Sequence, residues 1–151
     1  MMTPLLEVRG LLVDREGRRV LDLEHLCVER GEVLAVVGPN GAGKTTLFLA
    51  LARLLKTRGG EMFFEGQPVE ALAPLDYRRR IALVLQEPLL MDLSVRENVA
   101  LGLRFRGLPQ AEGEARAAPW LDRLGIAHLA DRRAGQISGG EAQRVSLARA
   151  F

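Results

Sequence analysis

The 151-residue sequence is poor in cysteine, in histidine and in net charge. It has one cysteine, Cys27, and two histidines, which excludes an internal disulfide framework and a cysteine-rich zinc site. No apolar run reaches the roughly 18 residues that a membrane span requires. The first residues, Met1–Pro4, show no secretory leader and run directly into strand-like sequence. These absences favour a cytoplasmic protein, and the net charge of +2 is too small to indicate a nucleic-acid partner.

Glycine is plentiful, and its most informative cluster lies between Gly38 and Thr46, with the letters GPNGAGKTT. These letters match G-x-x-x-x-G-K-[ST], the phosphate-binding loop called Walker A. Chance produces this string in roughly one chain of this length in two hundred. The sequence around it lowers that figure further, because an apolar run, Val33–Val37, predicts a buried strand before it and Leu47–Leu55 predicts a helix after it.

The residue types in this loop suit a phosphate tail and its metal ion. Glycines let the backbone N–H groups approach an anion at a helix N-terminus. In this interpretation Lys44 reaches the β- and γ-phosphates, the Thr45 hydroxyl binds Mg²⁺, and Thr46 bonds the α-phosphate. The predicted nucleotide-binding residues of the loop are Gly38, Asn40, Gly41, Ala42, Gly43, Lys44, Thr45 and Thr46.

The rest of the chain divides into an α/β part and a helical part. Strands are expected at Leu5–Arg9, Val20–Val28, Glu61–Glu65 and Ile81–Leu85, and a short helix is expected from Pro74. After Glu87 the apolar residues recur at helical spacing, as in Val95, Val99 and Leu103 and again around Trp120. The expected organisation is a nucleotide-binding lobe over residues 1–86 and a helical subdomain over residues 87–151.

A second motif, ISGGEAQRV, spans Ile137–Val145. Ser138 is a good N-cap, and Glu141 three residues later completes a capping box. Gly139 and Gly140 leave backbone amides open to an anion. Alone, the motif would indicate only a well-capped helix.

Together, the Walker A loop, Gln86 at the end of an apolar run, the helical segment and the ISGGEAQRV motif resemble the ATP-binding subunits of ABC transporters. The resemblance covers essentially the whole chain. It implies an α/β P-loop NTPase (RecA-like) lobe with an antiparallel β portion, plus an α-helical subdomain, incomplete at the C-terminus. It also implies that Gln86 contacts Mg²⁺ and the attacking water, and that Lys44 and Gln86 are the catalytic residues present.

The resemblance further implies a head-to-tail homodimer as the working form. The signature residues Ser138, Gly139, Gly140 and Glu141 of one copy would then close over ATP and Mg²⁺ held by the other. Further implied partners are a transmembrane permease subunit and an external solute-binding protein, with the ATPase peripheral on the inner face of the cell membrane. The stretches after Gln86 and Val95 look like bacterial importer subunits for oxyanions such as tungstate or molybdate, or for amino acids.

Two departures from the family pattern stand out. Arg15 occupies the position of the usual adenine-stacking aromatic residue, and its planar guanidinium can also lie on a base. The sequence ends at Phe151, before the family's Walker B aspartate, catalytic glutamate and switch histidine, and His128 precedes the signature motif. As it stands, the chain is therefore expected to bind ATP without hydrolysing it.

Two alternatives remain open at this point. One is a related ATPase that acts on nucleic acid or ribosomes, although the stretch from Gln86 to Ser138 leaves no room for long coiled-coil arms. The other is a non-hydrolysing nucleotide-binding fragment. The apolar residues Leu89–Met91 are either a docking site for the permease or locally buried.

Overall fold

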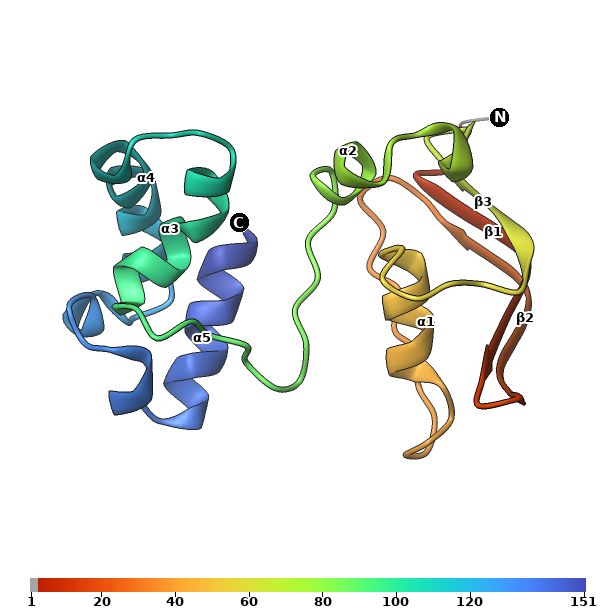
Figure 1. Ribbon diagram of the computed structural model, residues 1–151, viewed down its shortest axis with the longest axis horizontal. Helices are drawn as coiled ribbons and strands as arrows, with labels where there is room; N and C mark the ends of the chain where they lie inside the picture. The colour runs from red at the N-terminus through yellow and green to blue at the C-terminus, as the bar shows by residue number, and fades with distance from the viewer. Residues whose placement is uncertain (1–2) are drawn as a thin grey trace. The chain divides into compact units, whose positions relative to one another are not determined.

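The computed structural model describes residues 3–151, so the start of the chain, where no secretory leader is expected, lies partly outside the described residues. By its internal contacts the chain forms two compact units, which divide between Ile81 and Ala82. The strands belong to the first unit and the three longest helices to the second, as can be followed in Figure 1. The boundary expected from the sequence, after Gln86, lies five residues later, in a stretch of the second unit that has neither helix nor strand structure.

An antiparallel sheet in the order β2-β1-β3-β4 forms the base of the first unit. Its strands are β1 (Leu6–Arg15), β2 (Arg18–Val28), β3 (Gly59–Phe64) and β4 (Gln67–Pro68). In β1 the buried positions are Val8, Leu11 and Val13, which breaks the simple alternation of a strand. The register against β3 shifts between Arg9 and Leu12, where Gly10 has a φ of 61°, and the shift turns Leu11 rather than residue 10 into the core.

Helix α1 (Lys44–Leu51) lies beside this sheet (Figure 1) and buries Leu47 and Ala50 in its core. The 3₁₀ turn η1 (Val69–Ala71) and helix α2 (Pro74–Arg78) complete the unit. From α2, Tyr77 packs edge-on against Phe64 with ring centroids 5.5 Å apart, and its hydroxyl donates to the Leu51 carbonyl oxygen at 2.7 Å. The C-terminal end of α1 is therefore tied to α2.

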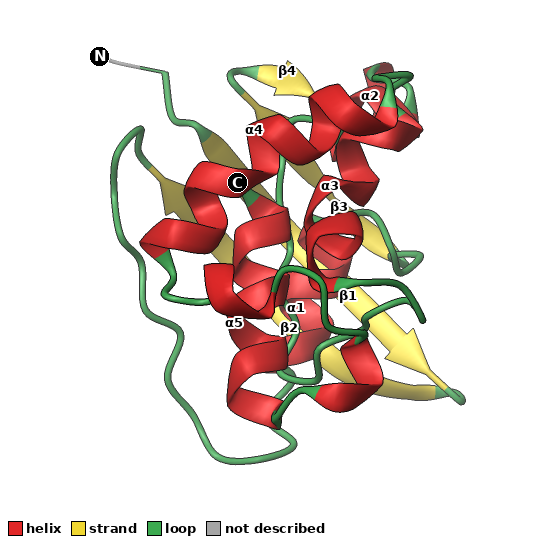
Figure 2. Cartoon of the chain, turned by 90° about the vertical axis from the view of Figure 1, so that its left-hand side faces the viewer, coloured by secondary structure: helices red, strands yellow, loops and turns green. Residues whose placement is uncertain are grey.

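Two expected strands do not form. Val33–Val37 and Ile81–Leu85 have neither helix nor strand structure, and in Figure 2 the strand colour is confined to β1–β4. Val33 is 96% exposed and Val37 is 92% exposed, so the prediction of a buried strand there was wrong. A β-strand needs a partner for its backbone N–H and C=O groups, and within residues 3–151 no strand pairs with either stretch.

The helix after the loop is also shorter than expected. It ends at Leu51 rather than continuing to Leu55, and Ala52 is its C-cap. Arg53 follows with a φ of 53°, and its guanidinium donates to the carbonyl oxygens of Val69 and Leu72, each at 2.9 Å. The left-handed backbone of Arg53 ends helix α1, and the bonds from its side chain connect this end of α1 to η1 and the residue that follows it.

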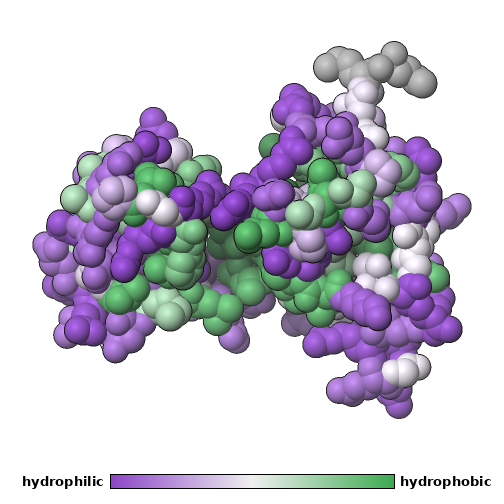
Figure 3. Space-filling view, turned by 45° about the horizontal axis from the view of Figure 1, so that its top comes forward, coloured by the Kyte–Doolittle hydropathy of each residue, from purple (hydrophilic) through white to green (hydrophobic). Residues whose placement is uncertain are grey.

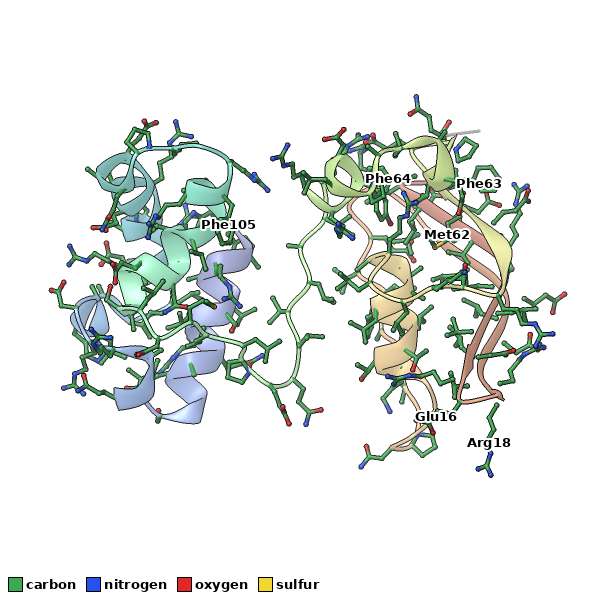
Figure 4. The ribbon with its side chains drawn as sticks, viewed as in Figure 1. Glu16, Arg18, Met62, Phe63, Phe64 and Phe105 are labelled. Atoms are coloured by element: carbon green, nitrogen blue, oxygen red, sulfur yellow. The ribbon has the colours of Figure 1, made fainter. Side chains whose placement is uncertain are left out.

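The second unit is helical. Its elements are α3 (Val95–Phe105), α4 (Gln110–Arg123), the 3₁₀ turns η2 (Ala127–Leu129) and η3 (Ala134–Gln136), and α5 (Gly139–Ala150). Its core draws on all three helices, and Trp120 packs against that core. Phe105, labelled in Figure 4 at the end of α3, is 76% exposed. Among the described residues, no helix is long and apolar enough to cross a membrane.

Candidate nucleotide-binding site

The loop between residues 38 and 43 is closed by its own backbone and by one side chain. The Ala42 N–H donates to the Pro39 carbonyl oxygen at 3.2 Å. Lys44, the first residue of α1, folds back so that its Nζ donates to the carbonyl oxygens of Gly38 at 2.6 Å and Pro39 at 2.7 Å. The ammonium group therefore ties the first residues of the loop to the start of the helix.

Gly43 is the N-cap of α1 in the left-handed conformation, with a φ of 86°, and no side chain caps the helix there. The first N–H groups of α1 consequently point toward the loop without a capping partner, and the positive end of the helix dipole lies at the same place. A Cβ on Gly43 would lie 2.7 Å from the Val20 carbonyl oxygen. The position therefore requires glycine both for its backbone conformation and for its close approach to β2.

The remaining loop residues are accessible. Asn40, Gly41 and Ala42 are exposed, as is Thr45 at the second position of α1, and Thr46 is half-buried. An ammonium group, several amides and a hydroxyl at one helix N-terminus match the groups that hold a nucleotide phosphate tail and its Mg²⁺. Within the part of the chain that the structure describes, no group of three or more His, Cys, Asp or Glu side chains is arranged to hold a metal ion.

Arg15 is the last residue of β1 and is exposed. It is paired in register with Arg18, the first residue of β2. Glu16 and Arg18, labelled in Figure 4, mark the turn beside it. Figure 1 shows this turn and the loop before α1 at the same end of the first unit, so Arg15 and the predicted phosphate loop lie at one end of the unit.

The signature motif forms the N-terminus of α5 with a complete capping box. The Ser138 hydroxyl oxygen accepts from the Glu141 N–H at 3.4 Å. In return Glu141 Oε2 accepts from the Ser138 N–H at 2.7 Å and from its hydroxyl at 2.8 Å. These bonds, the backbone one first, lower the pKa of Glu141 below its ordinary value. The prediction of a capped helix at Ser138 is confirmed.

Gly139 and Gly140 are exposed, and no atom lies within 4 Å of the place where a Cβ would project from either. The first turn of α5 is therefore open to an approaching group. Gln86 is exposed in the extended segment before α3. The loop of residues 38–46 belongs to the first unit, whereas Gln86 and Ser138–Glu141 belong to the second.

These motifs are found together in a known family. The family model described as ABC transporter matches residues 21–151 of the chain. The chain belongs to this family of ATP-binding subunits.

Individual relatives agree with the family match. The sequence is 39% identical over 149 residues to the energy-coupling factor transporter ATP-binding protein EcfA of Methanothermobacter thermautotrophicus, covering 95% of the chain and 48% of that protein. It is 43% identical over 135 residues to the methionine import ATP-binding protein MetN of Mesorhizobium japonicum, covering 87% of the chain and 37% of that protein.

A solved structure agrees with the fold. The structure of cbiO1 from Clostridium perfringens, part of the ABC transporter complex cbiONQ, matches with a TM-score of 0.82 and 32% identity, covering 98% of this chain and 61% of that one. The P-loop NTPase fold expected from the sequence is therefore confirmed. This ABC family member spans less than half the length of these two curated relatives.

The sequence analysis missed three features of the second unit. Helix α3 has its own capping box, in which Ser94 and Glu97 exchange the same bonds as Ser138 and Glu141; the S-x-x-E spacing was the available signal. Asn98 is fully buried. The available signal in the sequence was its place as a polar residue on the apolar face of α3. Gln143 and Arg149 of α5 contact the segment around Gln86, which no local pattern indicates.

Proposed function

We propose that this ABC family member binds ATP and Mg²⁺ at Gly38–Thr46 and, in the intact protein, hydrolyses ATP to power solute transport. The observation that carries the proposal is the position of Lys44, whose ammonium lies across the loop at the N-terminus of α1. A positive group there and the amides behind it favour a polyphosphate. The Thr45 hydroxyl is the magnesium ligand in this assignment, and Gln86 is a second ligand that also orients water.

The working form is a head-to-tail homodimer in which α5 of one copy faces the ATP of the other. The exposed glycines at positions 139 and 140 support this role, because they leave the first amides of α5 accessible at the positive end of the helix. Ser138 and Glu141 hold that helix end in shape through their capping box. Each ATP site is therefore complete only when two copies meet.

A transmembrane permease is the proposed partner at the segment after Gln86. Leu89 is 65% exposed and Met91 is 55% exposed, whereas Leu90 between them packs against the core of the second unit. The packing of the half-buried Leu90 holds the segment while its neighbours present apolar surface, as a docking site requires. Hydrophobic residues also reach the surface elsewhere on both units (Figure 3).

The proposed direction is import, with an external solute-binding protein delivering the solute. Support comes from the similarity to MetN, which is named as a methionine import protein. The subunit would be cytoplasmic and peripheral on the inner face of the cell membrane. Reconstitution of the intact ATPase with its permease in vesicles tests this, since ATP-driven export of the solute would refute the import assignment.

The central assignment is tested by titrating the intact protein with ATP after the change Lys44→Ala. We expect ATP affinity to fall by about tenfold or more, since a charge-assisted bond to phosphate is lost. The matched control is Lys56→Ala, which removes an exposed lysine outside the loop. Unaltered ATP affinity in Lys44→Ala would overturn the assignment of the loop.

A further inference from the structure

Two side chains of α5 hydrogen-bond to the segment that contains Gln86. The Gln143 amide donates from Nε2 to the Leu85 carbonyl oxygen at 3.1 Å. The Arg149 guanidinium donates from Nη1 to the Leu89 carbonyl oxygen at 2.9 Å. The two acceptors lie on either side of Gln86, so the signature helix holds this segment at both ends.

Apart from the packing of Leu90 against the core of the second unit, the bonded segment is held mainly by hydrogen bonds from other elements. Residues 81–85 and 88–91 have no regular secondary structure, and residues 86 and 87 form a bend. Its carbonyl groups therefore do not belong to a helix or strand ladder. Further along, Asn98 fixes the chain at Met91, accepting from its N–H at 2.9 Å and donating to its carbonyl oxygen at 3.0 Å. The span around Gln86 thus lies between fixed points on α5 and α3.

The chemical setting favours both donors. Gln143 and Arg149 are each partly buried, and burial lowers the pKa of Arg149 below its ordinary value. An arginine stays protonated even so, and its bond to the Leu89 carbonyl is charge-assisted. A partly buried charge that loses its acceptor is unfavourable, so the Arg149 bond resists opening.

We propose that Gln143 and Arg149 are positioning residues that make the Gln86 segment move as one body with helix α5. The inference rests on the proposed function, because it connects the signature end of α5 to the permease-facing residues Leu89 and Met91. When ATP held by a second copy engages Ser138–Gly140, the displaced helix carries the carbonyls of Leu85 and Leu89 with it. Gln86 and the permease contact are displaced in the same step.

The test uses the intact protein reconstituted with its permease. Gln143→Leu and Arg149→Met each remove one donor at similar volume, and Arg149→Lys restores a cationic donor. The matched controls are Gln110→Leu on α4, whose amide bonds Glu114 at 2.7 Å, and Arg104→Met on α3, which is exposed. The readouts are ATP affinity, solute-stimulated ATP hydrolysis relative to the basal rate, and hydrogen exchange of the Leu90 and Met91 amides, which are hydrogen-bonded.

We expect unchanged ATP affinity, a fall in the stimulation ratio of roughly fivefold to tenfold for each removed donor, and exchange of the Leu90 and Met91 amides faster by a similar factor. Arg149→Lys should recover part of both effects, and the control variants should leave both unchanged. A purely structural role would accelerate exchange without altering the stimulation ratio, and that result overturns the inference. So does a result in which neither readout changes.

Failure of this inference is distinguishable from failure of the proposed function. If Lys44→Ala retains full ATP affinity, the assignment of the nucleotide site fails. If Lys44→Ala loses affinity while Gln143→Leu and Arg149→Met keep the stimulation ratio, only the positioning role fails. Should Gln143→Leu not fold, as judged by exchange over α4, the Arg149→Met and Arg149→Lys pair carries the test.

Discussion

The Lys44 ammonium and the Gly38 carbonyl oxygen lie 2.6 Å apart, and the same ammonium lies 2.7 Å from the Pro39 carbonyl oxygen. These bonds join the first residue of α1 to the first residues of the loop before it. The position of the lysine charge and the shape of the loop are therefore set together. A site of this kind needs little reorganisation to receive an anion, which is how preorganised electrostatic sites gain affinity.

The change Gly43→Ala should damage both the loop and the fold. Its φ of 86° is unfavourable for alanine, and the added Cβ would lie 2.7 Å from the Val20 carbonyl oxygen. We expect a loss of about 2–3 kcal/mol in the free energy of unfolding and an ATP affinity lower by about tenfold or more. Urea denaturation and an ATP titration measure the two effects.

Gly41→Ala is the comparison for this prediction. Its φ of 83° is equally unfavourable, but no atom lies within 4 Å of the added Cβ. We therefore expect a loss of only about 1 kcal/mol. Equal losses for the two variants would show that the contact with Val20 does not constrain the loop.

The two capping boxes of the second unit separate helix stability from dimer formation. Ser138→Ala and Ser94→Ala each remove an N-cap whose partner glutamate is placed in the same way. Each should lower the free energy of unfolding by about 1 kcal/mol. Only Ser138→Ala should also weaken ATP-dependent dimerisation of the intact protein, measured by analytical ultracentrifugation, because only α5 faces the second copy in the proposed dimer. An equal effect of both variants on dimerisation would contradict the assignment of Ser138.

How far sequence predicts this structure depends on whether the signal is local. The cap of α5 at Ser138, the strands β1 and β2 and the apolar face of α3 were predictable because their patterns lie within one element. Val33–Val37 has the composition of a strand, but strand formation needs a pairing partner, which composition does not specify. The same limit applies to the site. The loop of residues 38–46 is encoded in consecutive letters, whereas the bonds of Gln143 and Arg149 join positions far apart in the chain.

Acid should destabilise α5 through Glu141. The Ser138 N–H and hydroxyl lower the pKa of Glu141 below its ordinary value of 4.5. Because the pKa of Glu141 is lower in the folded state, the ionised carboxylate contributes its full stabilisation above the unfolded-state pKa. This stabilisation is lost as the pH falls below 4.5 and through the folded-state pKa. Glu141→Gln should therefore flatten the acid branch of a plot of unfolding free energy against pH, measured by urea denaturation from neutral pH downward.

Glu97 provides a second test of how a capping glutamate makes stability depend on pH. Bonds from the Ser94 hydroxyl and then its N–H lower the pKa of Glu97 as well. The double variant of Glu97→Gln and Glu141→Gln should flatten the acid branch more than either single change, since the boxes cap different helices. An acid branch with the wild-type slope in the double variant would rule out this contribution.

Asn98 should be the most sensitive polar residue of the second unit. It is fully buried, its Oδ1 accepts from the Met91 N–H at 2.9 Å, and its Nδ2 donates to the carbonyl oxygens of Met91, Leu93 and Ser94 at 3.0–3.3 Å. Asn98→Leu removes the acceptor of the Met91 N–H. It also takes one donor from each of the three carbonyl oxygens, which keep backbone N–H donors. The change should lower the free energy of unfolding by about 1–3 kcal/mol. Asn98→Asp should cost at least about 3 kcal/mol, because it keeps the acceptor but buries a charge and removes the donors.

Ser146 of α5 provides the contrast for Asn98. It is 5% exposed, and within the described residues its hydroxyl has no hydrogen-bond partner. Ser146→Ala should therefore change the free energy of unfolding by less than about 0.5 kcal/mol or stabilise the protein slightly, since no bond is lost and a polar group leaves the interior. Urea denaturation of both sets of variants decides the point. If Ser146→Ala costs as much as Asn98→Leu, then burial of polar atoms rather than their bonds to residues 91–94 determines stability, and the role given to Asn98 is wrong.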